Sequence, residues 1–154
     1  MAVTAATLTT TVSESVTLNG KTIGNSITKT HASIKVVREQ IVTVPNGSEV
    51  ALYNAADSGA GVTFDEDLIK YARITNTDTT NFINLILETT AGDEFQYRVD
   101  AGTSFILSNH TNGFDATAAG ADVTPGSGYS PINNVTAKAD TAAVDVEIFV
   151  AATG

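Results

Sequence analysis

Hydrophobic and polar residues alternate along much of this chain, which is the two-residue repeat of a β-strand with one buried face. Phe95, Tyr97 and Val99 alternate with polar residues, and Val144 to Val150 repeats the pattern, with Phe149 on the polar side. These two segments are the clearest predicted strands. Further strands are expected at residues 34–44, 49–53, 69–75, 82–88, 104–108 and 134–139.

Turn signals divide these strands and suggest how the ends of the domain are built. Asn19-Gly20 lies between short apolar alternations and predicts a type I′ turn, hence a first hairpin near residues 14–27. Residues 1–12 are rich in Thr and poor in apolar side chains, and we expect an extended N-terminal arm there. Residues 109–133 include Pro125 and Pro131 and lack apolar periodicity, which indicates a long loop, either disordered or in contact with a partner.

Many short strands with turns every 8–12 residues bury their apolar faces best by stacking two sheets. We therefore predict an all-β fold, an antiparallel β-sandwich or jelly-roll-like single domain at residues 13–154, preceded by the arm at 1–12. The sequence leaves the order of the strands open.

The amino-acid composition is typical of an all-β protein and limits the classes of molecule that the protein could bind. Hydrophobic residues make up 42% of the 154 residues and charged residues only 16%, so Thr and Asn supply much of the polar surface. Eight Lys and Arg against 17 Asp and Glu give a net charge of −9, which argues against nucleic acid as a partner. Cys is absent, and we expect neither a cleaved leader nor a membrane span.

Residues that could carry chemistry do not form a recognisable site. The two histidines, His31 and His110, belong to no metal-binding spacing. Asp65-Glu66-Asp67, with Asp57, could be imagined as an oxygen cage for calcium, but the spacing is not that of an EF-hand, and a solvated turn capped by Asp65 is the preferred interpretation. We therefore predict no enzyme: no catalytic residue, cofactor or metal.

Carbohydrate binding is a separate possibility, because β-sandwiches often hold sugars. Sugar rings stack on exposed aromatic side chains, and this chain has no Trp. Most of its Phe and Tyr fall on predicted core faces, which leaves Tyr53, Tyr71 and Tyr129 as candidates. A small sugar-binding module is kept as an alternative on these three residues.

The middle of the chain resembles small virion structural proteins of tailed, particularly marine, bacteriophages. The resemblance is carried by two segments, Tyr71-Ala-Arg-Ile-Thr-Asn-Thr-Asp-Thr-Thr-Asn-Phe-Ile-Asn-Leu85 and Ala101-Gly-Thr-Ser-Phe-Ile-Leu107. Within them, Asp78 and Asn81 are suited to hold a turn through backbone bonds, Asn76 tolerates the left-handed region, and Gly102 allows a bend before Phe105 enters the core.

That resemblance implies a capsid decoration (cement) protein, made in the host bacterial cytoplasm, that lies on the outer capsid surface and bridges subunits of the major capsid protein. It also implies self-association, expected as a homotrimer. The arm and the 109–133 loop are the expected contact regions because they have the least core, and the contact residues predicted there are Val3, Leu8, Val12, Phe114 and Tyr129. A tail, neck or fibre subunit of the virion is the alternative location.

Overall fold

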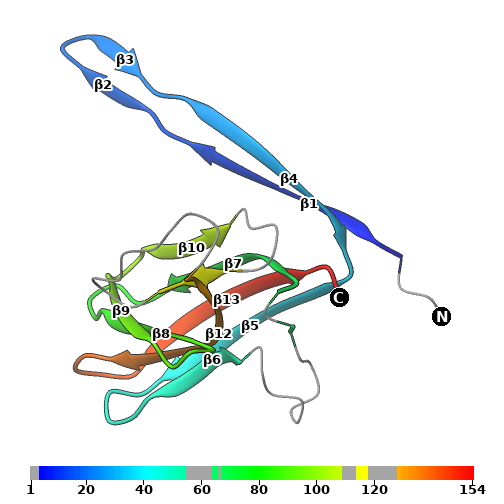
Figure 1. The fold of residues 1–154 in the computed structure, drawn as a ribbon. Coiled ribbons are helices and arrows are strands. Elements are labelled where there is room, and N and C mark those ends of the chain that lie inside the picture. Colours follow the sequence, from blue (N-terminus) through cyan, green and yellow to red (C-terminus); the bar gives the residue numbers. More distant parts are fainter. Residues whose placement is uncertain (1–3, 55–63, 66, 109–113, 118–127) are drawn as a thin grey trace.

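The protein consists of a body of two packed sheets and a long two-stranded arm that projects from it (Figure 1). The structure is a computed structural model, and it describes residues 4–54, 64–65, 67–108, 114–117 and 128–154. In these residues every regular element is a β-strand, paired antiparallel, so the predicted all-β sandwich is confirmed as a single domain.

The first sheet of the body, sheet I, has the order β10-β7-β13-β5. Its strands are β5 (Val36–Val44), β7 (Ile69–Asn76), β10 (Ser104–Ser108) and β13 (Val144–Ala152). Their inward positions are rich in Val and Ile, which suit a pleated, half-buried surface. In β13, residues 144, 146, 148 and 150 are fully buried, as the alternation predicts.

The second sheet, sheet II, runs β11-β12-β8-β9, and β6 also pairs with β12. Its strands are β6 (Val50–Asn54), β8 (Ile83–Thr89), β9 (Glu94–Val99), β11 (Asp115–Ala116) and β12 (Ser130–Ala139). Leu85 and Leu87 of β8 and Val135 of β12 are buried against sheet I. Because each fully buried Leu, Ile or Val contributes roughly 1.5–3 kcal/mol, this inter-sheet core is the main source of stability.

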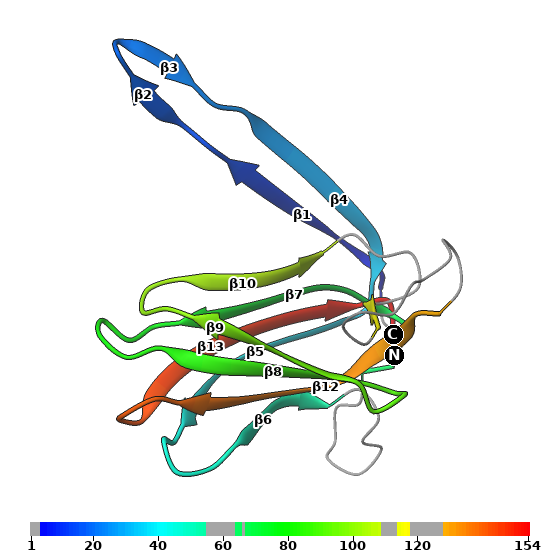
Figure 2. The ribbon, with the colours of Figure 1, turned by 60° about the vertical axis from the view of Figure 1, so that its left-hand side comes forward.

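The arm is one long hairpin made of two ladders. At its base β1 (Ala6–Ser13) pairs with β4 (Ser26–Ile34), and at its tip β2 (Val16–Leu18) pairs with β3 (Lys21–Ile23). The tip turns at Asn19 and Gly20, which have φ of 52° and 76° and so confirm the predicted type I′ turn. In Figure 2 the arm leaves the body above β10 and its tip stands well clear of both sheets.

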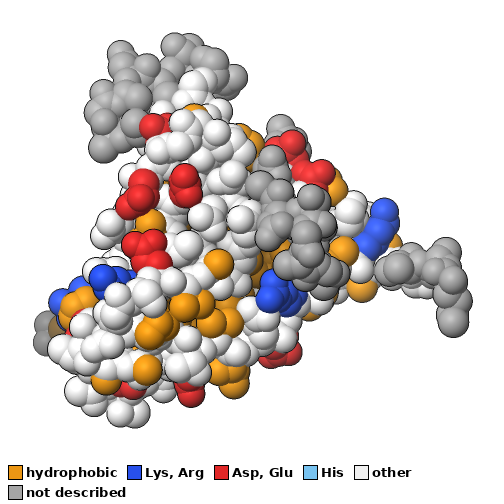
Figure 3. Space-filling view, turned by 90° about the horizontal axis from the view of Figure 1, so that it is seen from below, with side chains coloured by type: hydrophobic (Ala, Val, Ile, Leu, Met, Phe, Trp, Pro, Cys, Tyr) orange, Lys and Arg blue, Asp and Glu red, His pale blue; other side chains and the backbone are white. Residues whose placement is uncertain are grey.

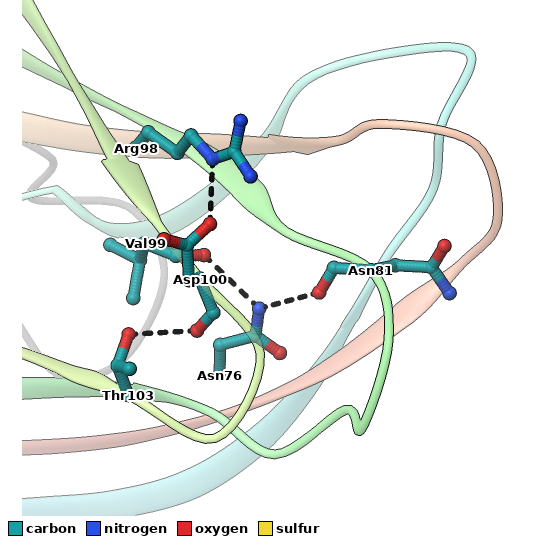
Figure 4. A network of polar contacts seen from close by, with 6 residues as sticks. All are labelled: Asn76, Asn81, Arg98, Val99, Asp100 and Thr103. Atoms are coloured by element: carbon teal, nitrogen blue, oxygen red, sulfur yellow. Dashed lines mark hydrogen bonds and ion pairs between the residues drawn. The ribbon is translucent and has the colours of Figure 1, made fainter.

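Asn76, at the end of β7, ties the two sheets together through a buried amide (Figure 4). Its Nδ2 donates to the carbonyl oxygens of Asn81 (2.8 Å) and Val99 (3.2 Å), and its Oδ1 accepts from the backbone N–H of Asp78 (3.0 Å). Its backbone also pairs with Gly102 and Thr103. One side chain therefore fixes the two turns by which the chain crosses between the sheets.

The turns in the segments that carry the resemblance form largely as predicted. Asp78 Oδ1 accepts from the backbone N–H groups of Thr80 and Asn81, both at 2.7 Å, and these bonds hold the pKa of Asp78 below its usual value. Gly102 has a φ of 70° at the predicted bend. The expectation for Asn76 was wrong, because its φ is not positive and its side chain, rather than its backbone conformation, stabilises the turn.

Three further expectations need correction. The arm does not end at residue 12, because β1 is held by β4 and residues 13–34 belong to the arm rather than to the sandwich. The predicted loop at 109–133 is shortened, because β12 already begins at Ser130 and Ile132 is buried. Phe95 and Tyr97 of β9 face inward beside Leu87 and Leu85, yet both are exposed because β9 is the edge of its sheet.

Candidate functional site

The two faces of the arm differ in chemistry. In a ladder, paired residues point to the same side, so Val12 and Ile27 lie together at the base, as do Val16 and Ile23 at the tip. With Leu18, these five apolar side chains are 53–66% exposed. We call this set the apolar arm face, and its residues are Val12, Val16, Leu18, Ile23 and Ile27.

Hydroxyl groups occupy the opposite face of the arm. Thr11 and Thr28 join their Oγ1 atoms at 3.1 Å across the base ladder, and Thr17 and Thr22 do the same at 3.1 Å near the tip. These cross-strand bonds help to fix the register of a ribbon that has little core of its own. The arm is thus held from its hydroxyl face while its apolar face stays available.

The arm is rooted on the outer face of sheet I. The N–H of Lys35, the single residue between β4 and β5, donates to the carbonyl of Ala152 at 3.0 Å. Just before it, the register of the base ladder shifts, and Ser33 takes a φ of 63° in the extra residues of a bulge. This bulge and this anchor set the direction in which the arm leaves the body.

His31 of β4 is buried at this root. Its ring lies 6.3 Å from that of Tyr71 of β7, and the Tyr71 ring lies 5.9 Å from that of Phe149 of β13. Burial, followed by the nearby charges of Lys29 and Lys70, lowers the pKa of His31 below 6.5. Among the described residues, no hydrogen-bond partner reaches His31 Nε2. The neutral imidazole therefore suits this apolar contact.

Beyond this contact the arm and the sheet diverge and enclose a groove of about 290 Å³. One wall is β1 from Leu8 to Val12, and the other is formed by side chains of β7, β10 and β13 on the outer face of sheet I: Tyr71, Arg73, Ile106, Ser108 and Phe149. The groove has mixed walls, since Arg73 forms an ion pair with Glu147 of β13 and bonds to the hydroxyl of Thr75.

The far side of the same outer face stays uncovered. Val37 and Ile41 of β5 are 55% and 69% exposed, and they flank Glu39. Ladder pairing places Ile41 beside Glu147 and Glu39 beside Phe149. We call this area the β5 patch, defined by Val37, Glu39, Ile41 and Glu147, two apolar side chains alternating with two carboxylates.

Charge is divided unequally between the arm and the body. Residues 1–34 contain Lys21, Lys29 and Glu14 as their charged side chains, so their net charge is +1. Because the net charge of the whole chain is −9, residues 35–154 have a net charge of −10. Acidic side chains are scattered over the side of the body that faces away from the arm, where a group of hydrophobic side chains also lies (Figure 3). Charges of opposite sign therefore reside on the arm and on the rest of the chain.

The predicted contact residues are scattered over the structure. Leu8 and Val12 lie on β1 at the groove, while Tyr129, which is 50% exposed, precedes β12 in the body. Phe114 was misassigned to the surface: it is 1% exposed and packs in the core, where its carbonyl accepts from the N–H of Ile132. Val3 and much of the 109–133 loop lie outside the described residues.

The sequence interpretation missed the outer half of the arm and the β5 patch. The alternation of Val16 and Leu18 around the Asn-Gly turn predicts a first hairpin of the sandwich, whereas the structure places this hairpin at the tip of the arm. Of the three tyrosines considered for sugar, Tyr53 is buried and Tyr71 is half-buried under the arm root, which leaves Tyr129 exposed.

The acidic segment forms a turn at the residues where it is described. Asp65 Oδ1 accepts from the N–H of Asp67 at 3.0 Å, and the Asp65 carbonyl accepts from Leu68 at 2.9 Å. Within the described part of the chain, no group of three or more His, Asp or Glu side chains is arranged to hold a metal ion. The same residues contain no helix long and apolar enough to cross a membrane. Asp57, Glu66 and His110 lie outside the described residues.

In comparison with known proteins, no protein-family model, curated protein or solved structure matches the chain.

Proposed function

We propose that this protein is a non-enzymatic structural component of a phage virion, a decoration protein that attaches to the outer capsid surface and bridges subunits of the major capsid protein. The observation that carries the proposal is the arm, a hairpin that projects from a rigid sandwich with five large apolar side chains exposed on it. Exposed apolar side chains gathered along one face of a projecting element are typical of a protein interaction site.

The body is suited to act as a platform for such an arm. Its segments that resemble phage virion proteins form β7, the turn to β8 and the start of β10, and the buried Asn76 network joins them. These residues stabilise the sandwich, and we assign the contact with the capsid to the arm. On a capsid, many copies bind at once, so weak individual contacts add up to stable attachment.

Shortening the arm tests this proposal directly. Replacing residues 15–24 by Asn-Gly joins Glu14 to Asn25, whose backbones are hydrogen-bonded across the arm, through a two-residue turn. The variant keeps the root at His31 and the whole body, so its Tm should stay close to that of the wild type. We expect it to lose co-sedimentation with empty shells of the major capsid protein.

A matched variant tests whether any substitution in the arm, rather than loss of its apolar face, reduces binding to shells. Thr17→Ser with Thr22→Ser alters the hydroxyl face of the tip and keeps the apolar face, and it should bind shells like the wild type. If the shortened arm binds shells as well as the wild type does, the arm is not the capsid contact. Antibody label at the tail, neck or fibre would place the protein there instead. Glycan binding that is lost in Tyr129→Ala would favour the sugar-binding alternative.

A further inference from the structure

We infer that the apolar arm face docks on the β5 patch of a second copy of this chain, so that copies join arm to body. Three features favour a second copy as the occupant: the charges of arm and body, the contact at the arm root and the area of the arm. Such self-association does not depend on capsid binding.

The chain already shows that arm and outer sheet face fit each other. Within one copy, Leu8 and His31 of the base ladder lie over the outer face of sheet I, with His31 beside Tyr71. The arm then diverges, so its own apolar face and the β5 patch are left exposed at different places. A second copy would cover the apolar arm face with an outer sheet face, and the β5 patch with an arm, as the arm root already covers Tyr71 within one copy.

Charge favours a body over another arm as the occupant. The apolar arm face carries Lys21 beside Leu18 in the tip ladder, and Lys29 lies on the same side of the base ladder as Ile27. Glu14 lies on this face between Val12 and Val16, so the face keeps one net positive charge. The β5 patch supplies Glu39 and Glu147, although Glu147 is shared with Arg73. With +1 on the arm and −10 on the rest of the chain, contact between arm and body is the only pairing of opposite sign.

Area indicates that the docking is mutual. The ladders from Val12 to Leu18 span seven residue pairs, so a ribbon ~10 Å wide with ~3.3 Å per residue has a footprint of ~230 Å². Stable interfaces bury about 800 Å² per partner, so a single docked arm is too small. A closed assembly, in which every copy donates one arm and receives another, doubles this area to ~460 Å² per copy, which corresponds to a weak association that depends on protein concentration.

The test compares substitutions on the two faces of the arm. Val16→Glu with Ile23→Glu places two carboxylates on the apolar arm face, whereas Thr17→Glu with Thr22→Glu places the same charge one residue away on the hydroxyl face. All four side chains are exposed on the arm, and each pair is directly opposite in the tip ladder, so the two variants place like charges in the ladder in the same way and leave the body unaltered. The mass of each full-length protein is measured by light scattering after size-exclusion chromatography over a wide range of concentration.

We expect the wild type and the hydroxyl-face variant to have a mass that is a multiple of 15.9 kDa, and the apolar-face variant to fall to 15.9 kDa. Ile41→Lys should also give the monomer, because it places a cation where the basic arm docks. Combining Ile41→Lys with Val16→Glu and Ile23→Glu should partly restore association, since the cation introduced on the patch can then pair with the carboxylates introduced on the arm.

Several results would overturn the inference: a wild type that is monomeric at every concentration, equal dissociation by substitutions on the two arm faces, or a combined variant no more associated than its parents. Binding to capsid shells is measured separately. A wild type that is monomeric and still binds shells refutes arm exchange and leaves the proposed function intact. A wild type that assembles and does not bind shells refutes the proposed function and leaves arm exchange intact.

Discussion

Asn76 offers the sharpest test of how the two sheets are held together. Asn76→Ala removes two hydrogen bonds donated by Nδ2 and one accepted by Oδ1, and it leaves the carbonyls of Asn81 and Val99 and the N–H of Asp78 without that partner. At about 1 kcal/mol for each bond lost, the free energy of unfolding should fall by about 3 kcal/mol. For a chain of this size, that loss lowers Tm by roughly 6–12 °C.

Asn76→Asp separates hydrogen bonding from simple loss of volume. The introduced carboxyl group keeps the acceptor for Asp78, but its second oxygen faces two carbonyl oxygens in a buried site. Burial and these carbonyls raise its folded pKa above the unfolded value of about 3.9, so the stability of this variant falls as pH rises through that range. Each unit by which the folded pKa exceeds the unfolded pKa lowers the free energy of unfolding at neutral pH by about 1.4 kcal/mol.

Urea unfolding followed by far-UV circular dichroism measures both effects. Asn84→Ala, on the exposed side of β8, is the matched control and should change stability by no more than about 0.5 kcal/mol. A loss under about 1 kcal/mol for Asn76→Ala, or a stability of Asn76→Asp that follows the wild type between about pH 5 and about pH 8, would refute the role assigned to this amide.

Three further predictions concern the arm and the core. The pKa of His31 in the folded protein lies below 6.5, so the unfolded state binds the proton first as pH falls. The free energy of unfolding should therefore be highest above pH 6.5 and should decline below it. An NMR titration of His31 with a pKa at or above 6.5 would contradict this prediction. Gly24→Ala places a Cβ 2.0 Å from the carbonyl oxygen of Glu14, so amide exchange should accelerate at the arm tip while the Tm of the body stays unchanged; unaltered exchange would count against the tight ribbon. Tyr53→Phe removes a buried hydroxyl that has no hydrogen-bond partner among the described residues, and should raise the free energy of unfolding by up to about 1 kcal/mol in urea; a clear loss would reveal a partner.

Local patterns were sufficient for most of the strands. β7, β8, β10 and β13 lie within a residue or two of their predicted ranges, because alternation reports directly on a half-buried pleated strand. Asn19-Gly20 and Gly102 were also predictable, since positive φ depends on a residue and its immediate neighbours. The bonds of Asp78 within its own turn belong to the same class.

Contacts distant in sequence were not predictable. Alternation in β9 showed that Phe95 and Tyr97 share a face with Val99, but not that β9 would be an edge strand that leaves both exposed. Phe114 was assigned to the surface because its segment lacks periodicity, yet it fills the core beside β12.

The candidate site depends most on such distant contacts. The sequence by itself determined that Val16, Leu18 and Ile23 would share one side of a hairpin. Only the tertiary structure decided that this hairpin stands away from the sandwich, and that Val37 and Ile41 remain uncovered. The physical reason is that side-chain direction follows from the local backbone, whereas burial requires a second surface, and that surface is brought into place by residues far away along the chain.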